Sequence, residues 1–70
     1  MESTTIKEIN SRKIDIENQL EDLFKKNMKI TDWDVPEADD NTAAQMIVKI
    51  MEDKLKLIKE DVDNGKYDFY

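Results

Sequence analysis

Among the side chains that could take part in catalysis or binding, carboxylates are the most numerous in this sequence. Its 70 residues include 17 Asp and Glu against 11 Lys and Arg, and they contain neither histidine nor cysteine. Hydrolysis and group transfer usually need a nucleophile beside a base, and the two serines, Ser3 and Ser11, both lie near an expected helix start. A disulfide is excluded, and a transition-metal site lacks its preferred ligands. We therefore expect no enzyme activity and no cofactor.

The acidic stretch near the middle of the chain invites comparison with a calcium-binding loop. An EF-hand loop needs oxygen ligands at alternating positions, a central glycine and a distal glutamate. Asp32 and Asp34 begin such a pattern, but Val35-Pro36 interrupts it and no glycine follows. The sequence therefore predicts no metal site here.

Binding of a basic partner is the chemistry that remains for these acids. Between Ile30 and Val48 there are five acids and no Lys or Arg, so local pairing cannot neutralise them. Acids near a helix N-terminus are favoured, which is an ordinary explanation for Glu37, Asp39 and Asp40. A second group falls in the expected last turn of the second helix, where negative charge opposes the helix dipole. We predict that eight carboxylates bind a partner: Asp32, Asp34, Glu37, Asp39, Asp40, Glu60, Asp61 and Asp63.

Two helices are expected to position these carboxylates. The second, from Thr42 to Val62, should stop at Asn64-Gly65, a left-handed C-terminal signal. Its apolar residues recur at steps of three or four, which places Ala44, Ile47, Met51, Leu55, Ile58 and Val62 on one side.

The first helix is expected from about Thr5 to about Met28. Thr5 and Glu8 have the spacing of a capping box, in which the two side chains satisfy backbone N–H groups of the first turn. A seven-residue repeat typical of a helical hairpin or a short coiled coil follows, formed by Ile9, Ile16, Leu23 and Ile30.

The stretch between the helices holds the only proline and the only tryptophan. Val35 should be extended because it precedes Pro36. We expect Trp33 and Val35 to turn inward as plugs between the helices. The second helix begins either at Pro36, which suits a first helical turn, or at Thr42, which forms a capping box with Gln45.

The C-terminal tail carries three aromatic residues in its last four positions: Tyr67, Phe69 and Tyr70. Two interpretations remain open. The aromatic rings fold back to cap the core, or they pack across a dimer or against a partner.

The length allows one domain, residues 1–70, of the all-α class. We expect a two-helix hairpin with an acidic connection and an aromatic C-terminal tail. Domains this short rarely hold more than about 3–5 kcal/mol on one core, and self-association is the remedy left when disulfides and metals are excluded. The broad apolar side of the second helix therefore predicts a helical homodimer.

The formal net charge of −6 disfavours nucleic acids and anionic membranes and favours basic partners. No segment approaches the roughly 20 apolar residues needed to span a bilayer. The first ten residues lack the basic and apolar regions of a signal peptide. We expect the protein in the cytoplasm, with no direct contact to nucleic acid or membrane.

The run DWDVPEADD, the short length, the net charge and the helix–acidic connection–helix layout resemble the small acidic DNA-mimic proteins of bacteriophages. Some of those proteins capture the histone-like nucleoid protein HU, and others capture restriction enzymes or nucleases. The resemblance implies a homodimer that occupies the DNA-binding surface of a basic protein in a bacterial host. Rows of carboxylates on a rigid helical dimer would imitate the charge of a phosphate backbone.

An alternative function needs no mimicry. The chain would then be a small helical protein-interaction module, such as an adaptor, an antitoxin-like inhibitor or a regulatory subunit. It would bind through apolar surface, with Trp33 and the aromatic tail. High salt separates the two hypotheses, because it weakens charge-driven capture and spares apolar binding.

Overall fold

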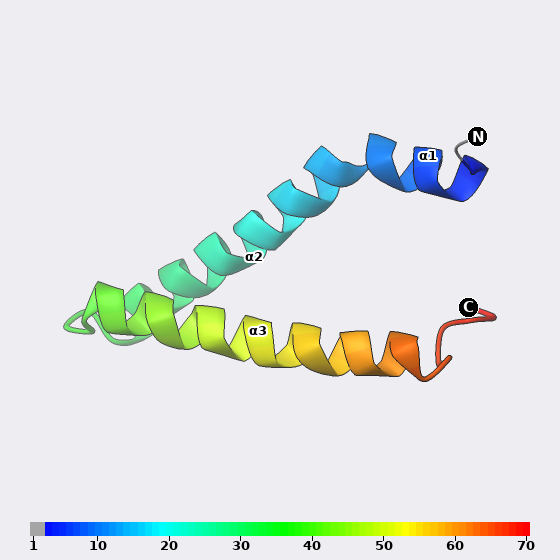
Figure 1. Ribbon diagram of the computed structural model, residues 1–70. Coiled ribbons are helices and arrows are strands. Elements are labelled where there is room, and N and C mark those ends of the chain that lie inside the picture. Colours follow the sequence, from blue (N-terminus) through cyan, green and yellow to red (C-terminus); the bar gives the residue numbers. More distant parts are fainter. Residues whose placement is uncertain (1–2) are drawn as a thin grey trace.

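The computed structural model describes residues 3–70 and contains three α-helices (Figure 1). Helix α1 spans Thr4–Ser11, α2 spans Lys13–Asp34 and α3 spans Asp40–Asp63. No strand occurs among the described residues, and the predicted all-α class is confirmed. Met1 and Glu2, which belong to the N-terminal segment interpreted above, lie outside the described residues.

The predicted single helix from about Thr5 to about Met28 begins within one residue of the expected start, but its end, its continuity and its cap are wrong. The cap is Ser3, whose hydroxyl accepts a hydrogen bond from the Ile6 N–H at 3.1 Å, and not Thr5. The helix is interrupted at residue 12, which has φ −97° and ψ 1°. The Ser11 hydroxyl donates to the carbonyl of residue 8 at 2.7 Å, a back-bond that competes with the helical ladder and bends helices.

Helix α2 continues six residues beyond the predicted end, so the connection shrinks to residues 35–39. Val35 has φ −135° and ψ 81°, outside the helical region, as the following proline requires. The Ala38 N–H donates to the Val35 carbonyl at 2.9 Å, which closes a turn with Pro36 in its second position. Asp32 and Asp34, predicted in the connection, therefore lie in the last turn of α2.

Helix α3 begins at neither predicted position. Asp39 is its N-cap residue, and Thr42 lies inside the first turn. The predicted stop is confirmed: Gly65 has φ 83°, and its N–H donates to the Val62 carbonyl at 3.1 Å. The Lys66 N–H donates to the Asp61 carbonyl at 3.0 Å, so the helix ends in a Schellman motif.

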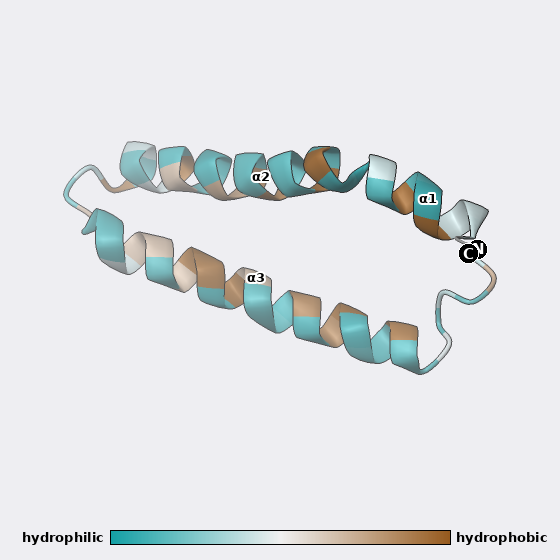
Figure 2. Cartoon of the chain, turned by 45° about the horizontal axis from the view of Figure 1, so that its top comes forward, coloured by the Kyte–Doolittle hydropathy of each residue, from teal (hydrophilic) through white to brown (hydrophobic). Residues whose placement is uncertain are grey.

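Helices α2 and α3 touch near the connection and diverge toward their other ends (Figure 1). Contact half-buries Phe24 and Met28 of α2 against Ala43, Ile47 and Met51 of α3. Figure 2 shows that apolar residues recur along both helices and not only where they meet. Most of the apolar surface therefore has no partner within the chain.

No residue among 3–70 is buried. The Cα radius of gyration is 16.3 Å, against about 11 Å expected for a compact domain of this length. The expected plugs are wrong, because Trp33 is 87% exposed and Val35 is also exposed. The tail does not cap a core either, since Phe69 and Tyr70 are fully exposed.

Candidate interaction surfaces

Five of the eight predicted carboxylates gather at the end of the molecule where α2 meets α3. We call Asp32, Asp34, Glu37, Asp39 and Asp40 the acidic tip. All five side chains are exposed. Two of them end α2, two lie in the connection and one begins α3. A short turn thus brings together acids that the sequence spreads over nine positions.

Two carboxyl groups of the acidic tip lie close enough to interact directly. A hydrogen bond shared with the Asp40 side chain holds the pKa of the Asp32 carboxyl above its ordinary value, and the negative charge of Asp40 acts in the same direction. Mutual repulsion of this kind is relieved by a cation between the two groups. The pair would therefore favour a lysine or arginine from a partner.

Asp39 has a structural task within the tip. The Thr42 hydroxyl donates to its Oδ2 at 2.6 Å and lowers the pKa of the Asp39 carboxyl, with smaller contributions from the N–H groups of Asn41 and Thr42. This bond holds a negative charge at the positive end of the α3 dipole. Asp39 thus carries its charge beside the first turn of α3, held by the Thr42 hydroxyl and without a capping hydrogen bond of good geometry to the backbone.

The remaining three predicted acids form a separate group at the far end of α3. Glu60, Asp61 and Asp63 lie in its last turn, where we expected them. Asp61 pairs with Lys66 at 3.4 Å. Asp40 and Glu60 are twenty residues apart on one helix, which corresponds to roughly 30 Å. One chain therefore does not unite the eight carboxylates in one surface.

Both long helices end on acids with no basic residue in the last turn. Each such acid places negative charge at the negative end of the helix dipole, which is unfavourable. Helix stability alone would favour lysine at these positions. The acids at the ends of α2 and α3 therefore call for an explanation other than folding.

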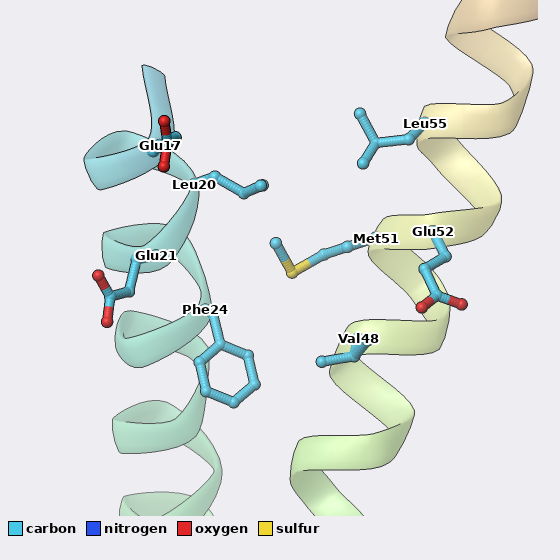
Figure 3. Close-up of a pocket in the computed structure, with 8 residues that line it drawn as sticks. All are labelled: Glu17, Leu20, Glu21, Phe24, Val48, Met51, Glu52 and Leu55. Atoms are coloured by element: carbon cyan, nitrogen blue, oxygen red, sulfur yellow. The ribbon is translucent and has the colours of Figure 1, made fainter. Parts of the chain in front are cut away.

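An apolar groove lies between α2 and α3, away from the connection (Figure 3). Its volume is about 440 Å³. Leu20 and Phe24 point from α2 toward α3, and Val48, Met51 and Leu55 point back from α3 (Figure 3). The groove is open to solvent, so an apolar side chain from outside could enter it.

Glutamates line the edges of this groove: Glu17, Glu21 and Glu52. Figure 3 shows their carboxylates turned away from the apolar floor. Glu21 pairs with Lys25 at 3.4 Å, with both side chains largely exposed. An exposed pair of this kind contributes little, so the rim keeps a negative character.

Sequence reasoning missed the groove as a site. Met51 and Leu55 were identified as apolar helix residues, but their register against residues of the other helix is a tertiary property. Nothing in the sequence marked Phe24 as a site residue, because it lies off the predicted seven-residue repeat. The glutamate rim could have been found from a helical wheel.

Aromatic side chains are exposed at both ends of the molecule. Trp33 lies on the last turn of α2, beside the acidic tip. In the tail, the Tyr67 and Tyr70 rings meet edge to face with centroids 5.6 Å apart, and Phe69 points into solvent. Trp33 and Phe69 thus present their rings to solvent, and the one ring contact is that between Tyr67 and Tyr70 among the described residues.

Within the described residues, no three carboxylates lie close enough to hold a metal ion. Among the same residues, no helix has the length and apolar character to cross a membrane. No protein family, no curated protein and no solved structure matches this chain. The geometry of its surfaces must therefore carry the functional argument.

Proposed function

We propose that the protein is an acidic helical binding protein that captures a basic protein and occupies the surface with which that protein binds DNA. The observation that carries this proposal is the acidic tip, in which five exposed carboxylates have no lysine or arginine among them. The crowding of Asp32 and Asp40 supports it, because a cationic partner would relieve their repulsion.

The partner that fits is a basic DNA-binding protein of the HU type in the cytoplasm of a bacterial host. Such a protein grips phosphates through Lys and Arg and would meet a substitute ligand in the tip. The acting form is a homodimer of two-helix hairpins, in which a second copy covers apolar surface left open by the first. Two-fold symmetry would then present two tips to a dimeric partner.

Competition with DNA tests this function. The protein is titrated into an HU-type nucleoid protein bound to a fluorescent DNA duplex, at about 50 mM salt and again at about 200 mM. Release of the DNA at the lower salt, and weaker release at the higher, is expected. No release at the lower salt would refute capture of HU-type proteins.

Two variants of equal charge locate the binding surface. Asp32→Asn, Asp34→Asn and Asp40→Asn together remove three of the five charges of the acidic tip and leave Asp39 at the start of α3. Glu60→Gln, Asp61→Asn and Asp63→Asn remove the same charge at the far end. We expect the tip variant to lose at least tenfold in affinity and the far-end variant to lose less. The reverse order would move the site to the end of α3.

A second function is favoured by the exposed aromatic residues. Trp33 is 87% exposed beside the tip and Phe69 is fully exposed, which suits an interaction module that binds through apolar surface. Its partner would stay bound at high salt and would be lost on Trp33→Ala or Phe69→Ala. Capture that survives both substitutions but weakens with salt would eliminate this alternative.

A further inference from the structure

One side of the helix pair carries six exposed apolar residues. Phe24 and Met51 point toward the groove, and the residue before each is rotated by about 100° around its helix. Because α2 and α3 run in opposite directions, this rotation takes Leu23 and Ile50 to the same side, opposite the groove. Residues at helical spacing complete what we call the open face: Ile16, Leu23, Ile30, Met46, Ile50 and Leu57.

The open face is apolar, and the chain as a whole exposes more surface than a compact domain of its size. Its six side chains are each 47% to 66% exposed. The chain exposes 6599 Å² in total. A compact protein of 8.3 kDa would expose about 4,600 Å², so the excess is roughly 2,000 Å². A standard interface needs only about 800 Å² from each partner.

We infer that a second copy of this chain covers the open face, with the two acidic tips at opposite ends of the dimer. This inference rests on the homodimer of the proposed function and adds its interface and its orientation. A two-fold axis passes through the level of Leu23 and Ile50, and it pairs α2 with α2 and α3 with α3 in antiparallel fashion.

Charge selects the open face over the groove. Self-association through the groove would bring Glu17, Glu21 and Glu52 of both copies together. The open face holds no acid among its six residues, and Asp39 is the one acid that lines the hollow beside Met46 and Ile50, against three glutamates at the groove. Two half-buried polar neighbours, Asn27 and Thr31, donate to the carbonyls of Leu23 and Asn27, each at 2.9 Å, so neither donor is left unsatisfied in the interface.

Charge also selects the orientation. Two tips at the same end would place five carboxylates beside five more. With tips at opposite ends, residues equally distant from Leu23 meet across the axis, so Ile16 packs on Ile30. By the same count, Asp34 of one copy lies beside Arg12 of the other, and Lys13 is one residue away. On α2 this orientation therefore joins opposite charges. On α3 the same count about Ile50 places Asp40 of one copy at the level of Glu60 of the other, a smaller repulsion than that between the two whole tips in the other orientation.

The level of the axis follows from the register of the two helices. Figure 3 places Phe24 across from Val48, and Leu20 between Met51 and Leu55. Leu23 and Ile50 therefore lie at about the same height along the molecule. An axis at that height brings each of these two residues close to its own counterpart.

Single cysteines test this geometry cleanly, because the chain has none of its own. Leu23→Cys and Ile50→Cys should each give a disulfide-linked dimer on mild oxidation, with most of the protein in the crosslinked form. Val48→Cys in the groove is the matched control and should stay unlinked. Ile16→Cys and Ile30→Cys should crosslink when the two variants are mixed, and not when each is alone.

A second measurement uses the unaltered protein. A carbodiimide reagent should join Lys13 of one copy to Asp34 of the other in a mixture of ¹⁴N and ¹⁵N chains. The two residues are 21 positions apart on α2, roughly 32 Å, so the link cannot form within one chain.

The outcomes separate the interface from the function. A dimer in ultracentrifugation that crosslinks through Val48→Cys, or through Ile16→Cys alone, overturns the inferred interface and leaves the homodimer standing. A monomer at micromolar concentration overturns both the interface and the homodimer. If the protein fails to release DNA from the HU-type protein while the crosslinks form as expected, the proposed function is overturned and the inferred interface is supported.

Discussion

Replacing Gly65 by alanine tests the end of α3 directly. Gly65 has φ 83°, in the left-handed region, and its N–H closes the Schellman motif on Val62 at 3.1 Å. A residue with a Cβ pays roughly 1–2 kcal/mol there. The less flexible unfolded chain of the variant returns about 0.4–1 kcal/mol, so a net loss of about 1 kcal/mol is expected.

The Cβ of the variant would also lie 3.0 Å from the Asp68 Oδ2. That atom is the end of a flexible side chain, so this contact should add little. Gly65→Ala in combination with Asp68→Ala measures it, since the double variant should recover only the part caused by the contact. The backbone strain should remain.

Urea denaturation at one fixed protein concentration measures the change, because a dimer's stability depends on concentration. Asn64→Ala is the control: Asn64 has φ −87°, which alanine adopts without strain, and its change should stay within about 0.5 kcal/mol. Equal midpoints for Gly65→Ala and the unaltered protein would refute the argued strain at Gly65.

Three other predictions concern caps and carboxyls. Asp40→Asn should lower the pKa of Asp32 toward 3.8 in a carboxyl NMR titration. Because the pKa of Asp32 is raised in the folded protein, ionisation of Asp32 opposes folding above this pKa, and the penalty fades as pH falls through the raised pKa. Thr42→Ala should raise the pKa of Asp39, whose stabilising effect is present above 3.8 and is lost as pH falls through its lowered pKa. Ser3→Ala should cost α1 about 0.5–2 kcal/mol and reduce its helical NMR shifts, whereas unchanged shifts would deny Ser3 its capping role.

Apolar spacing predicted α3 well because that helix has a periodic apolar side and a glycine stop. Its end at Gly65 was found to the residue. The break between α1 and α2 was missed because it depends on one hydroxyl, which Ser11 turns back onto its own helix. A seven-residue repeat running through that point gave no sign of it.

The predictions of which residues are buried were the least accurate. Trp33 and Val35 were expected inward because large apolar residues usually are, and capping of a core was one of the two interpretations left open for the tail aromatics. That rule presumes a core, and two diverging helices supply none within the chain. The carboxylates of the tip were identified from sequence, but the closeness of Asp32 to Asp40 follows from the turn at Pro36, and the distance to Glu60 follows from the length of α3.

Salt should act in opposite directions on the two associations proposed for this protein. Each chain carries −6, so two chains approach against a net repulsion while the apolar open face draws them together. The Debye length falls from about 10 Å at 0.1 M salt to about 3 Å at 1 M, which screens that repulsion. Dimerisation measured by ultracentrifugation should therefore tighten as salt rises, and capture of a basic partner should weaken. A dimer that dissociates with added salt would show that charge, and not the open face, holds the two copies together.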